Sequence, residues 1–315
     1  MKLTFLGTSA AVPTRNRNVT AMAFQLDQHP DWWLIDCGEG TQHQVLRSKY
    51  TLPKLSRIFI SHMHGDHCFG LMGLLATRGL QGAQEPLTVY GARGVRDLFD
   101  SVRRASNMHF RYPIEVIECG PGIVFEDDEV QVRAVEVLHA GQTLAFIIQE
   151  KPQPGRFRVE DARALGIPSG PIFGRLKNNE KVVLDDGREI DGATLVDPPR
   201  EGRKAVIVTD TRDASAILPF ADRADLLVHE ATYVEAERVQ ATEHNHSTAT
   251  DAARLAKKAR VMRLVLSHFS PRYEVPEPGM PGVKELVEEA RAVFNEGEVI
   301  AAWDFMTVEI PRAAR

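Results

Sequence analysis

The sequence predicts an α/β protein in which sheets are covered by helices. Short apolar runs typical of strands alternate along the chain with stretches whose apolar residues recur at helical spacing. This alternation favours sheets packed against helices. Apolar residues make up 43% of the 315 residues, enough for a substantial core, which excludes disorder for most of the chain. At about 150 residues per domain, this length suggests two domains or one large domain with an insertion.

Nine strands and four helices are expected, in the order of these runs. The strands are expected at Leu3–Leu6, Trp32–Ile35, Ile58–Ile60, Leu87–Tyr90, Val130–Val137, Leu144–Ile148, Ala205–Val208, Leu226–Val228 and Leu264–Leu266. The helices are expected at Phe69–Leu80, Val95–Ala105, Thr248–Arg260 and Val283–Phe294. Ser247 and Thr248 stand where an N-cap is expected, because their side-chain oxygens can accept hydrogen bonds from amides of the first turn.

Charge and cysteine content exclude two classes of protein. Lys and Arg number 38 and Asp and Glu 43, a net charge of −5, which excludes a strongly basic nucleic-acid coat but not a local basic patch. Three cysteines without a CxxC pair argue against a secreted disulfide framework and favour a reducing cytoplasm. No apolar run approaches the ~18 residues of a membrane span. The first residues faintly resemble a signal peptide, but polar residues interrupt them, so a strand is the better interpretation.

Residues 151–200 interrupt the alternation. This segment holds six prolines, and residues 151–204 carry eleven basic against nine acidic side chains. A long segment rich in helix and strand breakers inside a compact domain is typical of a functional excursion. Its composition fits an ordinary solvated insertion equally well.

The segment Ser61–His67, which reads SHMHGDH, is the strongest chemical signal. It follows an apolar strand and places four metal-type ligands within six residues. His62 and His64 alternate along an extended chain and can point the same way, while Gly65 allows a turn that aims Asp66 and His67 at a second point. The pattern predicts two adjacent metal ions.

Three further candidate ligands each follow an expected strand. They are His139, Asp210 and His268. Ligand sites in open α/β sheets gather at strand ends, so we expect these side chains to complete the cluster.

This order of motifs resembles the metallo-β-lactamase superfamily, and further motifs resemble its ribonuclease Z family. The latter are Phe5–Thr8, Leu34–His43, His229–Thr232 (HEAT) and His246–Thr248 (HST). The resemblance implies a four-layer αββα sandwich, with one catalytic domain over residues 1–315. It also implies that residues 151–200 form a protruding, flexible arm inserted in that domain.

The resemblance implies two zinc ions per chain, with manganese or cobalt as substitutes. One ion takes His62, His64 and His139, and the other takes Asp66, His67 and His268. Asp210 bridges the two. Asp36 is expected to orient a ligand histidine, the alternative being an exposed turn residue. His229 is expected either behind the ligands or as a buried structural residue.

The resemblance also implies how the chain acts. Asp66 orients or deprotonates the attacking water, and His246, held by Glu230, gives a proton to the leaving 3′ oxygen of tRNA. The products are tRNA with a 3′-OH and a trailer with a 5′-phosphate. The loop Pro13–Asn18 resembles a PxKxRN motif near the cleaved end, with Arg15 where Lys is usual. Arg15, Arg17 and Asn18 are therefore expected to contact substrate.

In the arm, Ile167–Pro171 fits the Gly/Pro-rich tip. The residues expected to grip precursor tRNA there are Gly170, Pro171, Arg175 and Lys177. A cytoplasmic homodimer without membrane or DNA partners is expected. Two alternatives stay open: another hydrolase of this fold acting on a small substrate, and a non-catalytic metal-binding or RNA-binding protein.

Overall fold

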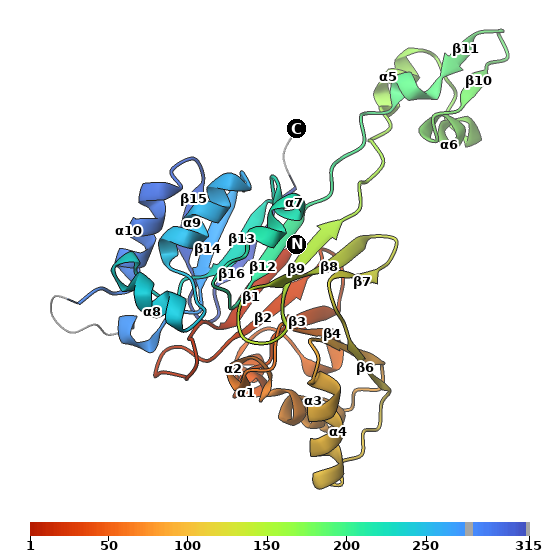
Figure 1. The fold of residues 1–315 in the computed structure, drawn as a ribbon. Coiled ribbons are helices and arrows are strands. Elements are labelled where there is room, and N and C mark those ends of the chain that lie inside the picture. The colour runs from red at the N-terminus through yellow and green to blue at the C-terminus, as the bar shows by residue number, and fades with distance from the viewer. Residues whose placement is uncertain (275–279, 313–315) are drawn as a thin grey trace. The chain divides into compact units, whose positions relative to one another are not determined.

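The computed structural model describes residues 1–274 and 280–312. The chain forms two compact units, one made of Met1–Gln149 with Arg203–Arg315 and the other of Glu150–Gly202 (Figure 1). Within the described residues, no helix is both long and apolar enough to cross a membrane.

The first sheet of the larger unit has seven strands in the order β16-β1-β2-β3-β4-β5-β6. Their bounds are β1 (Lys2–Gly7), β2 (Ala21–Gln25), β3 (Trp32–Ile35), β4 (Leu55–Ile60), β5 (Leu87–Gly91), β6 (Ile114–Glu118) and β16 (Thr307–Glu309). Strands β3 to β6 run parallel, whereas β1 pairs antiparallel with both β2 and β16. The last strand of the chain thus completes the sheet that the first strand begins.

The second sheet also has seven strands, in the order β15-β14-β13-β12-β9-β8-β7. Their bounds are β7 (Gly122–Glu126), β8 (Val130–Val137), β9 (Thr143–Glu150), β12 (Lys204–Val208), β13 (Leu226–Glu230), β14 (Arg263–Ser267) and β15 (Glu298–Ala301). Strands β12 to β15 are parallel, so their carboxyl ends meet at one edge.

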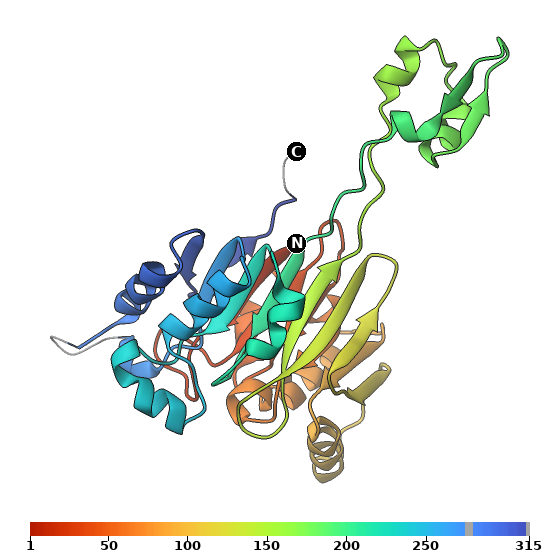
Figure 2. The same cartoon turned by 45° about the horizontal axis from the view of Figure 1, so that its top comes forward.

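Helices cover the outer face of each sheet, which gives four layers (Figure 2). The helices are α1 (Thr41–Arg47), α2 (Gly65–Cys68), α3 (Leu71–Leu80), α4 (Val95–Ala105), α7 (Leu218–Ala221), α8 (Arg238–Glu243), α9 (Ala249–Lys258) and α10 (Val283–Val293). On β12, Ala205 and Ile207 face the core between the sheets, while Val206 and Val208 face the core under the helices. The four-layer αββα sandwich expected from the sequence is confirmed.

The smaller unit has its own hydrophobic core, with Phe157, Ala162 and Leu176 among its buried residues. Its elements are α5 (Val159–Ala164), α6 (Pro171–Lys177), β10 (Lys181–Val183) and β11 (Glu189–Asp191). The sequence predicts no helix or strand here, because prolines and glycines interrupt the periodic patterns.

All nine expected strands and all four expected helices are present, but several of them begin or end at other residues than expected. The helix expected from Phe69 is wrong at its start, because the chain is already helical from Gly65 in α2 and resumes in α3 at Leu71. Seven strands and several helices of the described residues are not predicted from the sequence. These strands are β2, β6, β7, β10, β11, β15 and β16. All seven have five residues or fewer, too short for a clear periodic pattern.

Candidate metal centre

Seven side chains from both sheets meet at the carboxyl ends of strands in the larger unit. His62 and His64 follow β4, and Asp66 and His67 lie in α2. The other three follow β8, β12 and β14, and they are His139, Asp210 and His268. They form two groups, each with ligand atoms within 4.8 Å of one another, and Asp210 belongs to both groups. The structure therefore brings together all seven metal-ligand candidates.

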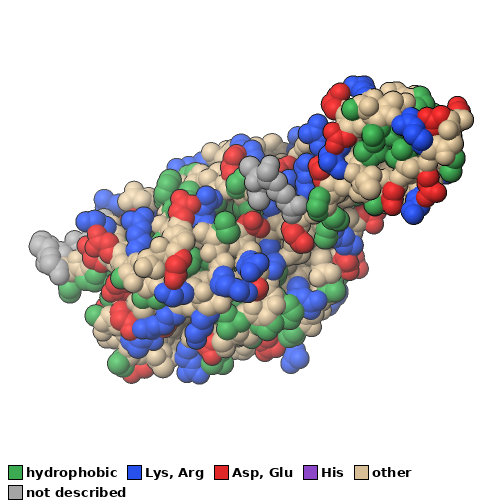
Figure 3. All heavy atoms as spheres, turned by 90° about the horizontal axis from the view of Figure 1, so that it is seen from above, with side chains coloured by type: hydrophobic (Ala, Val, Ile, Leu, Met, Phe, Trp, Pro, Cys, Tyr) green, Lys and Arg blue, Asp and Glu red, His purple; other side chains and the backbone are tan. Residues whose placement is uncertain are grey.

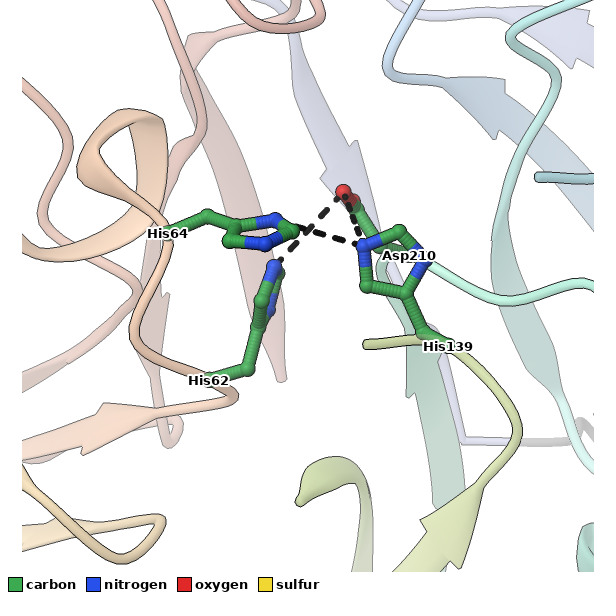
Figure 4. A group of neighbouring side chains, drawn as sticks. All are labelled: His62, His64, His139 and Asp210. Carbon is green, nitrogen blue, oxygen red and sulfur yellow. Dashed lines mark hydrogen bonds and ion pairs between the residues drawn. The ribbon is translucent and has the colours of Figure 1, made fainter. Parts of the chain in front are cut away.

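The first group consists of His62, His64, His139 and Asp210, whose side chains point toward one another in Figure 4. The Nε2 atoms of His62 and His139 lie 3.7 and 3.6 Å from Asp210 Oδ2. His139 Nε2 also lies 3.3 Å from His64 Nδ1. His64 thus presents its Nδ1 atom to the group, whereas the other two histidines present Nε2.

The second group lies on the other oxygen of the same carboxylate. His67 Nε2 and His268 Nε2 are each 3.2 Å from Asp210 Oδ1 and each 3.4 Å from Asp66 Oδ2. Burial raises the pKa of Asp210, but the neighbouring His268 and His67 outweigh burial and hold that pKa well below the usual range for an aspartate. Asp210 is therefore a carboxylate that offers one oxygen to each group.

Both groups fit divalent ions. A tetrahedral zinc ion with ligand distances of 2.0–2.2 Å places neighbouring ligand atoms about 3.4 Å apart, close to the separations seen here. His62 Nε2, His67 Nε2 and Asp210 Oδ1 are buried and find no hydrogen-bond partner of acceptable geometry among residues 1–274 and 280–312. Buried polar atoms are rarely left unpaired, so three such atoms aimed at common points favour ions between them.

A buried carboxylate orients two of the histidines. Asp36 Oδ2 accepts a hydrogen bond from His67 Nδ1 at 2.7 Å and one from the Ser61 hydroxyl at 2.9 Å. His62 Nδ1 in turn donates to Ser61 Oγ at 3.0 Å. These bonds place the protons on Nδ1 and leave each Nε2 lone pair aimed at its group. Asp36 is fully buried, so the alternative of an exposed turn residue is wrong.

A second buried carboxylate serves the opposite side of the centre. Thr232 donates to Glu230 Oε2 at 2.6 Å and accepts from His268 Nδ1 at 3.0 Å. Glu230 also contacts His246, whose Nδ1 lies 3.0 Å from Oε1. Burial lowers the pKa of His246, but the charge and hydrogen bond of Glu230 outweigh burial and raise that pKa to about 9. His246 therefore carries a proton at neutral pH.

Four residues around the centre have left-handed backbones, although none is a glycine. Asp36, Asn245 and His268 have φ values of 55°, 58° and 57°. The Asn245 carbonyl accepts from His139 Nδ1 at 2.7 Å. Ala11, with φ of 61°, donates its amide to Asp66 Oδ2 at 2.8 Å. Such conformations are costly for L-residues and concentrate at functional sites.

The other expected site residues lie elsewhere. His229 is buried on β13, and its Nδ1 donates to the Glu230 carbonyl rather than to a proposed ligand. Arg15 is exposed, while Arg17 donates to Thr8 Oγ1 and to the Ala302 carbonyl. Asn18 donates to the Glu39 carbonyl. Four expected RNA contacts, namely Gly170, Pro171, Arg175 and Lys177, lie at α6 of the smaller unit.

Sequence reasoning missed four groups that support the centre. These are the Ser61 and Thr232 hydroxyls, the Asn245 carbonyl and the Ala11 amide. Ser61 and Thr232 lie inside motifs that the sequence displays, so their positions were a usable signal. The two main-chain groups carry no signal in the sequence.

The chain is similar to known proteins over nearly its whole length. It is 49% identical to ribonuclease Z of Nostoc punctiforme, covering 99% of this chain and 97% of that protein. It is 47% identical to ribonuclease Z of Synechocystis sp. (99% and 95%) and 45% identical to that of Brevibacillus brevis (93% and 92%). A family model described as Anti-Pycsar protein Apyc1 matches residues 1–149.

Two solved structures are similar in fold. The short form of human tRNase Z has a TM-score of 0.71 and 29% identity, covering 99% of this chain and all of that one. The metallo-β-lactamase fold protein YhfI from Bacillus subtilis has a TM-score of 0.66 and 19% identity, covering 98% of each chain. The second likeness shows the fold alone.

Proposed function

The chain belongs to the ribonuclease Z family, and from this membership we propose how its residues divide the work of cutting precursor tRNA. It is a hydrolytic, metal-dependent tRNA endonuclease that processes tRNA 3′ ends.

The centre would hold two zinc ions per chain. His62, His64 and His139 would hold one, Asp66, His67 and His268 would hold the other, and Asp210 would offer one oxygen to each. The observation that carries this assignment is that the two oxygens of Asp210 each lie 3.2–3.7 Å from a separate set of histidines. When bound, two such ions supply Lewis acidity that withdraws charge from the phosphodiester and makes water a better nucleophile at neutral pH.

Two side chains of the centre handle protons. Asp66, at the edge of the centre and 10% exposed, accepts a hydrogen bond from the attacking water and aims it at the phosphorus. His246 turns Nδ1 to Glu230, so its Nε2–H is the proton available to the leaving 3′ oxygen. Glu230 keeps His246 protonated and oriented. Cleavage then leaves tRNA with a 3′-OH and a trailer with a 5′-phosphate.

Residues 151–200 act as a tRNA-binding arm within a single catalytic domain that spans residues 1–315. The segment's own hydrophobic core and its exposed basic side chains, such as Arg175, support this role. Basic and acidic side chains are intermixed on the face in Figure 3, which suits recognition of one folded RNA rather than a general nucleic-acid coat. The chain works as a cytoplasmic homodimer that binds no DNA.

The test of this function is cleavage of a precursor tRNA with an extended 3′ trailer, with the cut mapped at both new ends. We expect one cut at the 3′ end of the tRNA body, with the end groups stated above. Hydrolysis of bis(p-nitrophenyl) phosphate without cleavage of the precursor would instead favour a small-substrate phosphodiesterase.

Elemental analysis of the purified, active protein tests the metal assignment. We expect about two metal ions per chain, because seven ligands exceed one tetrahedral site but suit two that share a bridge. Chelation should abolish hydrolysis, and zinc, manganese or cobalt should restore part of it. Active protein with one ion per chain contradicts the two-ion assignment.

A further inference from the structure

Trp303 is a large aromatic side chain that the chemistry above does not use. The other tryptophans, Trp32 and Trp33, are 1% and 3% exposed, whereas Trp303 is 56% exposed. It follows β15 in the turn that leads to β16. An indole left this exposed presents a flat apolar face for binding.

Hydrogen bonds on both sides hold this turn in place. The carbonyl of Ala302 accepts from Arg17 Nη1 at 2.8 Å. Asp304 accepts three hydrogen bonds of 2.7–2.8 Å, from Thr8 Oγ1, the Asn18 amide and Gln44 Nε2. A side chain on a fixed turn loses little conformational freedom when a ligand binds, which favours its use as an anchor.

The segment that clamps this turn also touches the metal centre. Residues 8–20 link β1 to β2, and within them the Ala11 amide donates to Asp66 Oδ2. The Arg17 guanidinium lies 5.0 Å from the ring centroid of Phe269, the residue after His268. The segment of residues 8–20 therefore contacts the turn that carries Trp303, the proposed ligand Asp66, and Phe269, the neighbour of the proposed ligand His268.

A hollow of about 430 Å³ lies against the indole, between residues 16–17 and the start of α10. Its lining includes Asn16, Arg17, Tyr273, Glu274, Lys284 and Trp303. Glu274 accepts a hydrogen bond from the Asn16 amide at 3.1 Å. Acidic and basic side chains both line the hollow, so it has no strong net charge of one sign. The feature of the hollow that suits a nucleotide is therefore the flat face of the indole.

We propose that Trp303 is a stacking platform for an unpaired nucleotide that flanks the scissile phosphate of precursor tRNA. This inference rests on the proposed function. Unpaired bases near a cut site are splayed out and stack on aromatic side chains. Such stacking tolerates any sequence, because every base has a π face. A contact of this kind suits an enzyme that meets a different trailer on each precursor.

Kinetics on a precursor tRNA test the platform through Trp303→Ala and Trp303→Phe. Loss of one base–aromatic stack weakens binding by roughly 5- to 150-fold, so the alanine variant should raise KM by at least about 5-fold. The phenylalanine variant should recover most of this loss. Hydrolysis of bis(p-nitrophenyl) phosphate should stay at the wild-type rate in both variants, because that substrate has no flanking nucleotide.

Met262→Ala is the matched control. Met262 is 66% exposed and precedes β14, at the strand end opposite to His268, so its loss should leave KM unchanged. Salt adds a second discrimination. A stacking contact neutralises no phosphate, so the ratio of variant to wild-type KM should stay constant as salt rises. A ratio that falls steeply with salt overturns the platform in favour of a phosphate contact.

Fluorescence tests binding without turnover and distinguishes the two sides of the cut. Trp303 is the exposed tryptophan, so its long-wavelength emission should be quenched by a trailer oligonucleotide with a 5′-phosphate or by mature tRNA, and Trp303→Phe should lose that quenching. Quenching by the trailer places the nucleotide after the cut, and quenching by the tRNA places it before the cut.

Three results overturn the platform. They are wild-type KM in Trp303→Ala, failure of Phe to restore what Ala removes, and RNA quenching that persists undiminished in Trp303→Phe. Each presupposes that the wild-type protein cleaves the precursor. If the wild-type protein leaves the precursor uncut, the proposed function has failed instead.

Discussion

At the residue scale, four non-glycine residues around the metal centre, Ala11, Asp36, Asn245 and His268, have left-handed backbone conformations. An L-residue pays roughly 1–2 kcal/mol to adopt this conformation. At Ala11 the conformation aims an amide at Asp66 Oδ2. The surrounding hydrogen bonds must hold it there, because nothing in the side chain of alanine favours it.

Two substitutions at Ala11 should separate the amide from the side chain. Ala11→Gly keeps the donor and relieves the strain, so metal retention should equal that of the wild type. Ala11→Val makes the left-handed conformer costlier, and an added cost of about 1 kcal/mol weakens retention roughly 5-fold. Metal release into a chelator measures both. Equal release from the two variants would mean that the amide does not position Asp66.

His246→Ala should lower kcat on precursor tRNA by roughly 10²–10⁴ while leaving metal content unchanged, because it removes the proposed proton donor. A nitrophenyl diester has a better leaving group and should lose much less. With a pKa of about 9, wild-type His246 loses its proton as pH rises, so kcat should fall above about pH 9. That decline should be absent in His246→Ala. Equal losses on both substrates would argue against the acid role.

Single residues also mark the limit of sequence reasoning about the site. The seven ligand candidates stand out because metal-binding side chains recur at strand ends, whereas the roles of Glu230 and His246 were expected only from the resemblance to a family. The Thr232 hydroxyl was visible in the same motif, but its partner His268 lies 36 residues away, so the contact depends on the fold. The main-chain groups of Ala11 and Asn245 have no sequence signature at all.

At the element scale, helix α9 shows how the sequence positions a functional side chain. Thr248 caps the helix, with its hydroxyl accepting from the Asp251 amide while Asp251 Oδ2 accepts from the Thr248 amide. The cap was predictable from Thr248 alone. Because His246 precedes the cap by two residues, a fixed helix start also fixes the approach of His246 to Glu230.

Asp251→Ala should destabilise the protein in a pH-dependent way. Burial raises the pKa of Asp251, but hydrogen bonds from Arg238 and Thr248 outweigh burial and hold that pKa below its ordinary value. A lowered native pKa means that the contribution is complete above the unfolded pKa of about 4 and is lost as pH falls through the native pKa. Near pH 7 the cost should be about 1 kcal/mol, the usual value of a cap.

Thermal unfolding of both proteins, with a chelator present throughout, checks this. The difference in Tm between wild type and Asp251→Ala should shrink as pH is lowered from 7 to below 4. A difference independent of pH would show that the carboxylate charge adds nothing to the cap.

For the other elements, the length of the element decides whether the sequence predicts it. Strand β8 and helix α4 have the predicted bounds, because each carries a complete periodic or apolar pattern. Strand β16 has three residues, Thr307–Glu309, and exists because β1 offers an edge for pairing. The pairing with β1 stabilises this strand, so the three residues of β16 carry no strand pattern of their own that a sequence prediction could use.

At the scale of the whole molecule, the two compact units suggest a separation of binding from chemistry. The proposed ligands all lie in the larger unit, and the smaller unit contains Arg175 and Lys177. His139 and Asp210 lie on either side of the insertion in sequence. The folds of the two units therefore allow the insertion to be removed without removing a ligand.

Deletion of residues 153–198, with a short linker, should preserve hydrolysis of a small diester and metal content. Cleavage of precursor tRNA should collapse, mainly through a higher KM, because a remote grip acts equally before and at the transition state. The salt dependence of RNA binding should flatten, since phosphate contacts are lost. Wild-type processing by a folded, metal-loaded deletion variant would show that the segment is an ordinary insertion.

The pairing of β1 with β16 has a consequence for synthesis on the ribosome. Lys2 pairs with Glu309, and the Met1 carbonyl accepts the Ile310 amide, so the sheet around β1 is complete only after residues 307–310 have been made. At about 5–20 residues per second, translation of this chain takes roughly 15–60 s. During that time β1 has an unpaired edge and His268 has not yet joined Asp66. The proposed ligand set is therefore incomplete in any nascent polypeptide that does not yet include His268.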